Sequence, residues 1–208
     1  MITLNYPFPE SSHAENIKLV DSICRSGGVI VYPTETFYAI GGNALDIDLG
    51  ERLSAIKKRH PDKPFPTLIG SRQALEKLVQ SWPQTARLLA QKYWPGALTM
   101  VLPGLKNLPS AIIGKDGTIA VRWSSHPLVD ELAKISHLPL ISTSANLSGQ
   151  PPTTKADQLD PQLLASVDLL IVADNKNLNP QPSTIIDVRV DPPLLLRAGE
   201  VVISELLT

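Results

Sequence analysis

The sequence contains few of the features that mark secreted or membrane proteins. Its 208 residues include one cysteine, Cys24, so an internal disulfide is excluded and a reducing compartment fits. No apolar run approaches the ~20 residues that a membrane span needs, and the N-terminus lacks the basic and then apolar layout of a signal peptide. We therefore expect a cytoplasmic protein with no membrane attachment, in which Cys24 packs in a helix.

The sequence lacks features that are typical of several functional classes. The net charge is -1, so the strong basic field of a dedicated nucleic-acid binder is missing. The "GKD" at 114–116 lacks the upstream glycine and the hydroxyl of a phosphate-binding P-loop, and no GxSxG elbow occurs. The histidines are too scattered for a metal site: His13, His60, His126 and His137. We expect no metal ligated by the protein alone.

What is present is typical of one soluble α/β domain. Hydrophobic residues make up 43% and charged residues 19%, while 19 prolines indicate many sharp turns. We see no internal repeat, low-complexity tract or domain boundary. We therefore treat residues 1–208 as a single domain, a length that can bury a substantial core.

Helices and strands are predicted to alternate along the chain. Ser12 and Glu15 have the spacing of a capping box, and Gly27 with Gly28 would end that first helix. Further helices are predicted over 49–59, 71–80, 83–94, 127–136 and 161–167, with strands over 29–33, 66–70, 97–102, 118–123, 139–145, 168–174, 183–188 and 193–199. Strands that are apolar throughout indicate a sheet covered on both faces, and the Pro and Asn cluster at 174–183 indicates a loop.

Small polar and basic residues stand where these strands run out. Thr34 and Thr36 follow the first predicted strand, and residues 142–146 carry "STSAN". Arg122 lies within the predicted strand 118–123, near its end, and Arg197 closes the "LLLR" run. Ligands of α/β sheets usually bind beyond the carboxyl ends of strands. Such residues also serve as turn formers and helix caps, but their joint appearance favours a binding site.

A basic cluster, "KKRHPDK", lies at the end of the predicted helix 49–59. Its cations are Lys57, Lys58, Arg59 and Lys63. They could merely complement the helix dipole. Alternatively, Arg and Lys held at a cleft would suit a polyphosphate, through a forked guanidinium and a mobile ammonium respectively.

These segments together resemble the YrdC family of threonylcarbamoyl-AMP synthases. The matching motifs, in order, are "YPTETFYAIGG", "KKRHPDKP", "WPGALTMVL", "TIAVRWSSHP", "STSANLSGQPPT", "STIIDV" and "LLRAGEV". They run from about Val29 to Val201. The resemblance implies an α/β fold with a twisted, mixed, open sheet flanked by helices around a large cleft.

The resemblance also implies a reaction and its partners. The enzyme would join L-threonine, bicarbonate or CO₂, and ATP into threonylcarbamoyl-AMP with release of pyrophosphate. Mg²⁺ would accompany the ATP, and no prosthetic group is implied. The product would feed threonylcarbamoyladenosine formation in tRNA through a separate transferase complex, and an affinity for tRNA or double-stranded RNA is a further implication.

Matching the motifs residue by residue assigns the expected site. The catalytic residues would be Lys57, Arg59, Ser144 and Asn146. The ATP contacts would be Arg59, Lys63, Thr118, Ser144, Asn146 and Arg197. The L-threonine contacts would be Thr36, Arg122, Ser142 and Ser183. Because the substrates supply their own nucleophiles, catalysis would consist mainly of positioning and charge neutralisation.

Some residues depart from the family pattern or stay open. Ala39 replaces the usual glycine, so we expect a negative φ or a slightly moved loop there. Leu68 stands where some members have histidine. Thr34 and Glu35 would support the loop. Gly41 and Gly42 indicate close backbone approach, an unusual dihedral, or only a turn.

Three alternatives remain at this point. The first is a YciO-like paralogue, which shares the fold but has altered activity. The second is a non-catalytic RNA-binding module that uses the same cleft. The third is the carbamoyl-transfer module of a hydrogenase-maturation protein. The chain resembles the short, single-domain form of the family.

Overall fold

A computed structural model describes residues 1–60, 63–173 and 181–203. The strands in these ranges form one sheet of ten, in the order β1-β8-β2-β3-β7-β4-β6-β5-β9-β10. The strands are β1 (Ile2–Tyr6), β2 (Ile30–Tyr32), β3 (Ala39–Asn43), β4 (Thr67–Ile69), β5 (Leu98–Pro103), β6 (Thr118–Trp123), β7 (Leu140–Ser144), β8 (Leu169–Ala173), β9 (Thr184–Asp187) and β10 (Leu194–Arg197). Parallel and antiparallel pairs are mixed, as expected.

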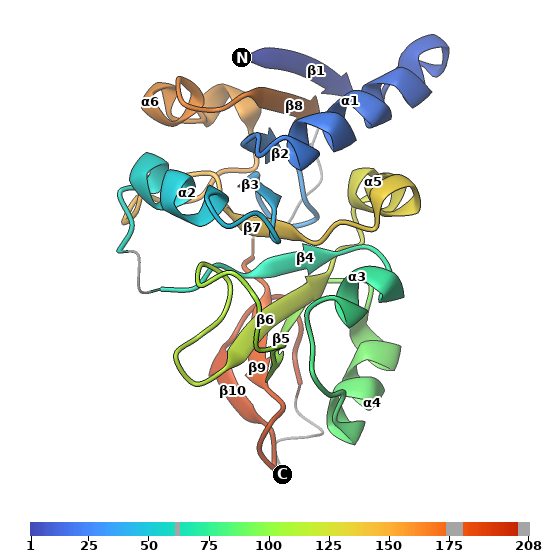
Figure 1. Ribbon diagram of the computed structural model, residues 1–208, viewed down its shortest axis with the longest axis vertical. Coiled ribbons are helices and arrows are strands. Elements are labelled where there is room, and N and C mark those ends of the chain that lie inside the picture. Colours follow the sequence, from blue (N-terminus) through green and yellow to red (C-terminus); the bar gives the residue numbers. More distant parts are fainter. Residues whose placement is uncertain (61–62, 174–180, 204–208) are drawn as a thin grey trace.

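The helices cover both faces of this sheet. They are α1 (His13–Arg25), α2 (Leu49–Lys57), α3 (Arg72–Glu76), α4 (Gln84–Tyr93), α5 (Pro127–Ser136) and α6 (Pro161–Leu164), with 3₁₀ turns η1 (Glu10–Ser12) and η2 (Ala156–Gln158). In Figure 1 the sheet runs down the molecule from β1, near the N-terminus, to β10, near the described C-terminal end. No helix in the described ranges is both long and apolar enough to cross a bilayer.

Two hydrophobic cores form on the opposite faces. One contains Val29 and Val31 with residues of α2, α3, α4 and α6, and the other contains Ile30 with residues of α1 and α5. Alternate residues of one strand therefore enter different cores, which explains why the strands are apolar throughout. Cys24 is 2% exposed in the second core, so its predicted packing role is confirmed.

Most predicted elements are present, but the N-terminal cap differs. Ser12 precedes α1, yet within the described structure its Oγ accepts a hydrogen bond from the Asn16 side chain at 3.2 Å and caps no backbone N–H. The preceding turn η1 leaves Ser12 at φ -124° and ψ 6°, outside the extended conformation of a capping residue. The predicted Ser12–Glu15 capping box is therefore wrong.

Other boundaries were wrong or cannot be compared. α3 ends at Glu76, four residues before the predicted end of the 71–80 helix, and β1 and β3 were not predicted as strands. Of the predicted loop 174–183, residues 174–180 lie outside the described residues. Pro61 and Asp62 of the basic motif also lie outside them.

Close backbone approach explains the paired glycines of β3. A Cβ added to Gly41 would lie 1.6 Å from the carbonyl oxygen of Ile141 in β7, and one at Gly42 would lie 2.5 Å from the carbonyl oxygen of Gly28. Only glycine fits such contacts without displacing a backbone. Of the alternatives left by the sequence, close approach is confirmed, and it occurs within a strand.

The sheet opens beside β7. β4 and β7 pair over two positions, Thr67 with Ile141 and Leu68 with Leu140. Beyond them Ser142 N–H donates to the carbonyl of Pro66 at 2.9 Å, and β7 continues past the start of β4. The end of β7 is thereby left facing a cleft.

Candidate functional site

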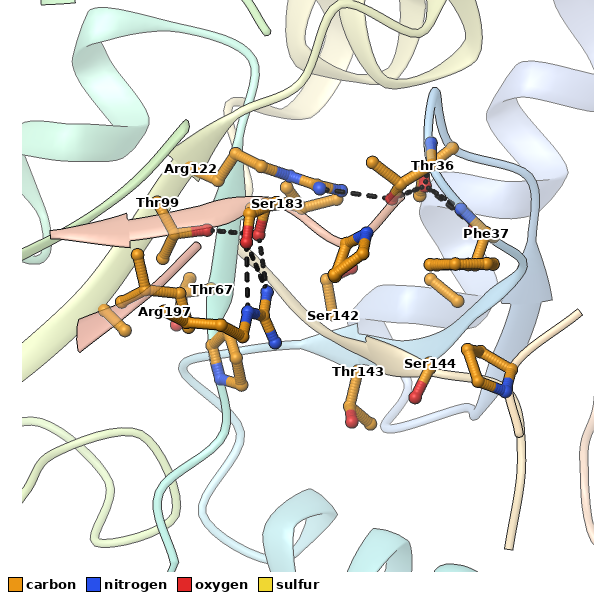
Figure 2. A pocket seen from close by; sticks show the side chains of 18 of the residues that line it. Thr36, Phe37, Thr67, Thr99, Arg122, Ser142, Thr143, Ser144, Ser183 and Arg197 are labelled. Atoms are coloured by element: carbon orange, nitrogen blue, oxygen red, sulfur yellow. Dashed lines mark hydrogen bonds between the residues drawn. The ribbon is translucent and has the colours of Figure 1, made fainter. Parts of the chain in front are cut away.

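A cleft of about 460 Å³ lies at this opening. Its lining includes seven of the residues that the motifs assign to the site: Thr36, Arg59, Arg122, Ser142, Ser144, Ser183 and Arg197. Figure 2 shows hydroxyl groups and two guanidinium groups gathered around it. Segments that are far apart in the sequence thus bring polar groups together in one compartment.

A second, basic groove of about 450 Å³ adjoins the cleft. Its lining includes three more of the assigned residues, Lys57, Lys63 and Asn146, together with Lys58, Arg59 and Ser144. Arg59, Thr143 and Ser144 line both compartments. The two spaces are therefore contiguous, and Arg59 stands at their junction.

The turn after β2 holds Thr36 in the cleft. Thr34 Oγ1 donates to the carbonyl of Phe37 at 2.7 Å and accepts from the N–H groups of Thr36 and Phe37. Thr36 Oγ1 lies 3.0 Å from Thr34 Oγ1 and accepts from Arg122 Nη1 at 3.2 Å. The predicted supporting role of Thr34 is confirmed by these bonds.

Arg122 is a buried cation on the cleft side of β6. The residue is 7% exposed, and its Nε lies 3.6 Å from Glu35 Oε1. The other Glu35 oxygen accepts from Ser124 Oγ at 2.6 Å. Glu35 therefore faces Arg122 and the β6–α5 turn, in agreement with the expectation that it supports the loop.

A hydrogen-bonded chain joins Arg197 to β5. Arg197 donates from Nε and Nη2 to the carbonyl of Ser183, and also from Nη2 to the Ser183 hydroxyl. The Ser183 hydroxyl lies 2.9 Å from Thr99 Oγ1, which is buried on β5 and lines the cleft. Burial lowers the pKa of Arg197, and the charge of Arg122 lowers it further. Sequence reasoning missed Thr99 because a hydroxyl inside a strand carries no signal, although it lies in the quoted motif "WPGALT".

Lys57 is directed at the backbone of the "STSAN" segment. Its ammonium donates to the carbonyl of Ser144, and to that of Asn146 at 2.6 Å. The residue is 3% exposed, and burial, aided by the charge of Arg59, lowers its pKa to about 8. In this arrangement Lys57 fixes the loop that carries Ser144 and Asn146.

Asn146 also takes part in holding its own loop. Its Nδ2 donates to the carbonyls of Leu147 at 2.9 Å and Gln150 at 2.6 Å. Its Oδ1 is buried and has no hydrogen-bond partner among the described residues. These bonds hold the residues after β7 in a compact loop beside the groove.

Arg59 reaches the junction because the chain turns sharply after α2. Lys58 adopts the left-handed conformation, with φ 52°, and Arg59 N–H then bonds to the carbonyl of Ser54. The guanidinium donates to the carbonyl of Pro64 and stacks 4.7 Å above the Phe65 ring. Burial lowers the pKa of Arg59, and its Nε has no partner within the described ranges.

Thr118 stands apart from the other assigned residues. It begins β6, its Oγ1 donates to Asp116 Oδ1 at 2.6 Å, and the described linings of the two compartments do not include it. Ala120 and Arg122, at the alternate positions of the same strand, do line the cleft. The structure therefore gathers every assigned side chain except that of Thr118.

The two departures from the family pattern both lie at the cleft. Ala39 is paired with Tyr32 and Ser144. Among the described non-glycine residues, positive φ is confined to Lys58 and His137, so the negative φ predicted for Ala39 is confirmed. Leu68 is 2% exposed and also lines the cleft.

The described residues contain no group of three or more His, Cys, Asp or Glu side chains suited to a metal ion. The donors that do gather are guanidinium, ammonium and hydroxyl groups, which suit anions. Chemically, the site offers a cleft with guanidinium and hydroxyl groups beside a groove with ammonium and guanidinium groups, and both could bind anions.

The chain is similar to curated proteins that share one name. The chain is 36% identical over 155 residues to the threonylcarbamoyl-AMP synthase of Pyrococcus abyssi and 35% identical over 164 residues to that of Bacillus subtilis. The alignments cover 74% and 76% of this chain, but 46% and 47% of those proteins. The chain therefore spans about half the length of these two relatives.

The chain is also similar to solved structures. P. abyssi Sua5 in complex with L-threonine matches with a TM-score of 0.85 and 34% identity, over 95% of this chain and 57% of that one. Escherichia coli YciO matches with a TM-score of 0.80 and 29% identity, over 95% and 94%. The protein-family model Sua5_yciO_yrdC, described as "Telomere recombination", matches residues 22–199. The chain belongs to the Sua5/YciO/YrdC family.

Proposed function

We propose that this protein synthesises threonylcarbamoyl-AMP from L-threonine, bicarbonate or CO₂, and ATP, with release of pyrophosphate. The observation that carries the proposal is the continuity of the two compartments through Arg59. A carboxylate-binding cleft and a phosphate-binding groove that share one cation suit a reaction that joins an amino acid to a nucleotide. The names of the relatives and the L-threonine of the P. abyssi complex support this choice.

In this proposal L-threonine occupies the cleft. Arg122 receives the α-carboxylate, since a guanidinium binds a carboxylate through two parallel, charge-assisted hydrogen bonds. The hydroxyl groups of Thr36, Ser142 and Ser183 are available for the amine and the side-chain oxygen. Thr99 extends the same hydroxyl cluster from β5.

ATP occupies the basic groove in this proposal. Arg59 and Lys63 neutralise the phosphates, while Ser144 and Asn146 contact the nucleotide from the segment that Lys57 holds. Arg197 approaches from the cleft side. Mg²⁺ is carried with the triphosphate: the cationic and hydroxyl donors of the groove suit the phosphates, and the ion prefers oxygen ligands such as phosphate and water.

The chemistry requires no nucleophile from the protein. The threonine amine bonds to the carbon of CO₂ and loses a proton, which gives a carbamate. A carbamate oxygen then attacks the α-phosphorus of ATP, and the bond to pyrophosphate breaks. The chain contributes by aligning the reactants and by neutralising charge, with Arg59 between the two compartments.

The wider role of the product is also a proposal. Threonylcarbamoyl-AMP would be consumed by a separate transferase complex that forms threonylcarbamoyladenosine in tRNA, and the reaction would take place in the cytoplasm. Affinity of this chain for tRNA or double-stranded RNA would follow from the cations of the basic groove.

Pyrophosphate release tests the function directly. The purified full chain is mixed with ATP, Mg²⁺, L-threonine and bicarbonate, and threonine-dependent release is expected. Arg59→Ala should abolish it, whereas Arg72→Ala should not, because Arg72 is exposed and forms a surface ion pair with Glu76. A folded wild-type protein that releases no pyrophosphate would overturn the proposal.

The YciO-like alternative is favoured by one observation, the match to E. coli YciO over nearly the full length of both chains. The assay separates the two, since a paralogue with altered activity would bind ligands without threonine-dependent turnover. The RNA-binding alternative requires RNA affinity that falls steeply with salt, as phosphate contacts release counterions.

A further inference from the structure

Glu35 is a partly buried carboxylate that the proposed reaction does not use. It belongs to the turn after β2, and its side chain is 15% exposed. Arg122 lines the cleft, whereas the described lining does not include Glu35. Its Oε1 is buried without a hydrogen-bond partner in the described ranges, 3.6 Å from Arg122 Nε.

The contacts of Arg122 divide its guanidinium into two sides. Nε faces Glu35, and Nη1 donates to Thr36 Oγ1 at 3.2 Å. Nη2 has no hydrogen-bond partner among residues 1–60, 63–173 and 181–203. The side occupied by Glu35 is therefore closed to a ligand, and the Nη side remains for a carboxylate.

Glu35 is itself held by contacts that do not involve Arg122. Its Oε2 accepts from Ser124 Oγ at 2.6 Å, and Ser124 Oγ accepts from the N–H of His126 at 3.1 Å. Ser124 is 2% exposed. These bonds hold the Glu35 carboxylate at the start of α5. Its fixed position can therefore set the orientation of the Arg122 guanidinium.

We propose that Glu35 is a positioning residue, the counter-ion that fixes Arg122 with its Nη side directed at the α-carboxylate of the amino acid. The inference rests on the proposed function, because it assigns that carboxylate to Arg122. A buried guanidinium without a counter-ion is costly, so removal of the Glu35 charge lets Arg122 leave this orientation. Affinity for the carboxylate then falls, although no ligand atom touches Glu35.

Glu35→Gln is the discriminating variant. It keeps the shape and an oxygen acceptor for Ser124, and removes only the charge. By calorimetry on the full chain, its affinity for L-threonine should fall about tenfold, as expected for loss of a well-aligned charge-assisted contact. L-Threoninamide, which lacks the carboxylate, should bind the wild type and the variant equally. Glu35→Asp, which keeps the charge at shorter reach, should recover part of the affinity.

Two outcomes would overturn the inference. One is unchanged L-threonine affinity in Glu35→Gln. The other is an equal loss for L-threonine and L-threoninamide, which would indicate that Glu35 only supports the loop. If Glu35→Gln fails to fold, Ser124→Ala gives the same comparison, since it frees the carboxylate while keeping both charges, and a selective loss for L-threonine is again expected.

A second readout does not depend on threonine. The Nε–H resonance of Arg122, assigned by its absence from Arg122→Ala, should exchange slowly with solvent in the ligand-free wild type and rapidly in Glu35→Gln. Unchanged exchange in the variant would overturn the inference even if the protein proved not to bind L-threonine. Failure of the wild type to bind L-threonine, with the exchange difference present, would count against the proposed function alone.

Discussion

Arg197 donates hydrogen bonds to the carbonyl oxygen of Ser183 at 2.7 Å and to its hydroxyl at 3.0 Å. The motifs assign Arg197 to the nucleotide and Ser183 to the amino acid. The two expected half-sites therefore share one hydrogen-bonded chain, which extends to Thr99. Substitutions in this hydrogen-bonded chain should show which of the two ligands each residue binds.

Ser183→Ala should weaken L-threonine binding about five- to tenfold, because one hydrogen bond from a neutral hydroxyl group is lost. Nucleotide affinity should change little, because the bonds of Arg197 to the Ser183 carbonyl persist. Calorimetry with each ligand alone measures both. Equal losses would mean that the hydroxyl sets the orientation of Arg197.

Arg122→Ala should weaken L-threonine binding by about a hundredfold, the scale of a bidentate ionic contact. Affinity for ATP should stay within about threefold, since Arg122 lines the cleft and is absent from the described lining of the groove. Calorimetry checks this, with exposed Arg72→Ala as the matched control. A parallel loss of both affinities would show that the cleft is wrongly divided.

The depressed pKa of Lys57 predicts a specific pH dependence of stability. In the folded protein Lys57 loses its proton near pH 8, while in the unfolded chain it does so near 10.5. Between these values the unfolded chain binds more protons, so the free energy of unfolding rises with pH in this window, and the stabilisation disappears as the pH falls through 8. The free energy of unfolding of the wild type, minus that of Lys57→Met, should rise by roughly 2–3 kcal/mol from pH 8 to 10.5.

Urea denaturation at a series of pH values measures this difference. Subtracting Lys57→Met removes the titration of the other lysines and tyrosines. A difference that stays flat across the window, or that falls with rising pH, would show that the ammonium of Lys57 titrates normally.

Gly41→Ala should destabilise the protein by more than about 3 kcal/mol, because the added methyl meets the backbone carbonyl of Ile141 rather than a movable side chain. Gly117→Ala is the control. At φ +74° with nothing within 4 Å of the added Cβ, it should cost about 1 kcal/mol from backbone strain alone. Denaturation curves compare the two, and similar losses would contradict the steric account of β3.

The elements that the sequence predicted well are those with local signals. The helix over 127–136 was predicted with the bounds that α5 has, because Pro127 stands at its first turn and apolar residues recur at helical spacing. His137 then ends it in the left-handed conformation. Such features need no knowledge of the rest of the chain.

The missed strands depend on distant partners. β1 pairs in parallel with β8, more than 160 residues away. Its sequence, "ITLNY", alternates apolar and polar residues as a strand does, but it is a short edge strand without an apolar run and was missed. β3 contains Gly41 and Gly42, which disfavour a strand in isolation but are required by the neighbouring backbones. In both cases tertiary pairing determines the structure.

Most of the residues that gather at the two compartments could be predicted from motifs, but the direction of each side chain could not. Lys57 and Arg59 belong to one motif, yet Lys57 is directed at backbone carbonyls and Arg59 at the junction of the compartments. The left-handed Lys58 between them separates their directions. The spacing of charges along the chain contains no such information.

The short pairing of β4 with β7 gives substrates a mechanical role. Two residue pairs join these strands, and the proposed threonine contacts lie on both sides of them, with Thr36 and Ser142 on one side and Arg122 on the other. A ligand bound there adds contacts between the two sides, where few backbone pairs join β4 to β7. Any ligand that binds only the folded state also opposes unfolding. Amide protons of β4 and β7 should therefore exchange more slowly when a ligand fills the cleft. The bound ligand would then hold together the two parts of the sheet that contact it.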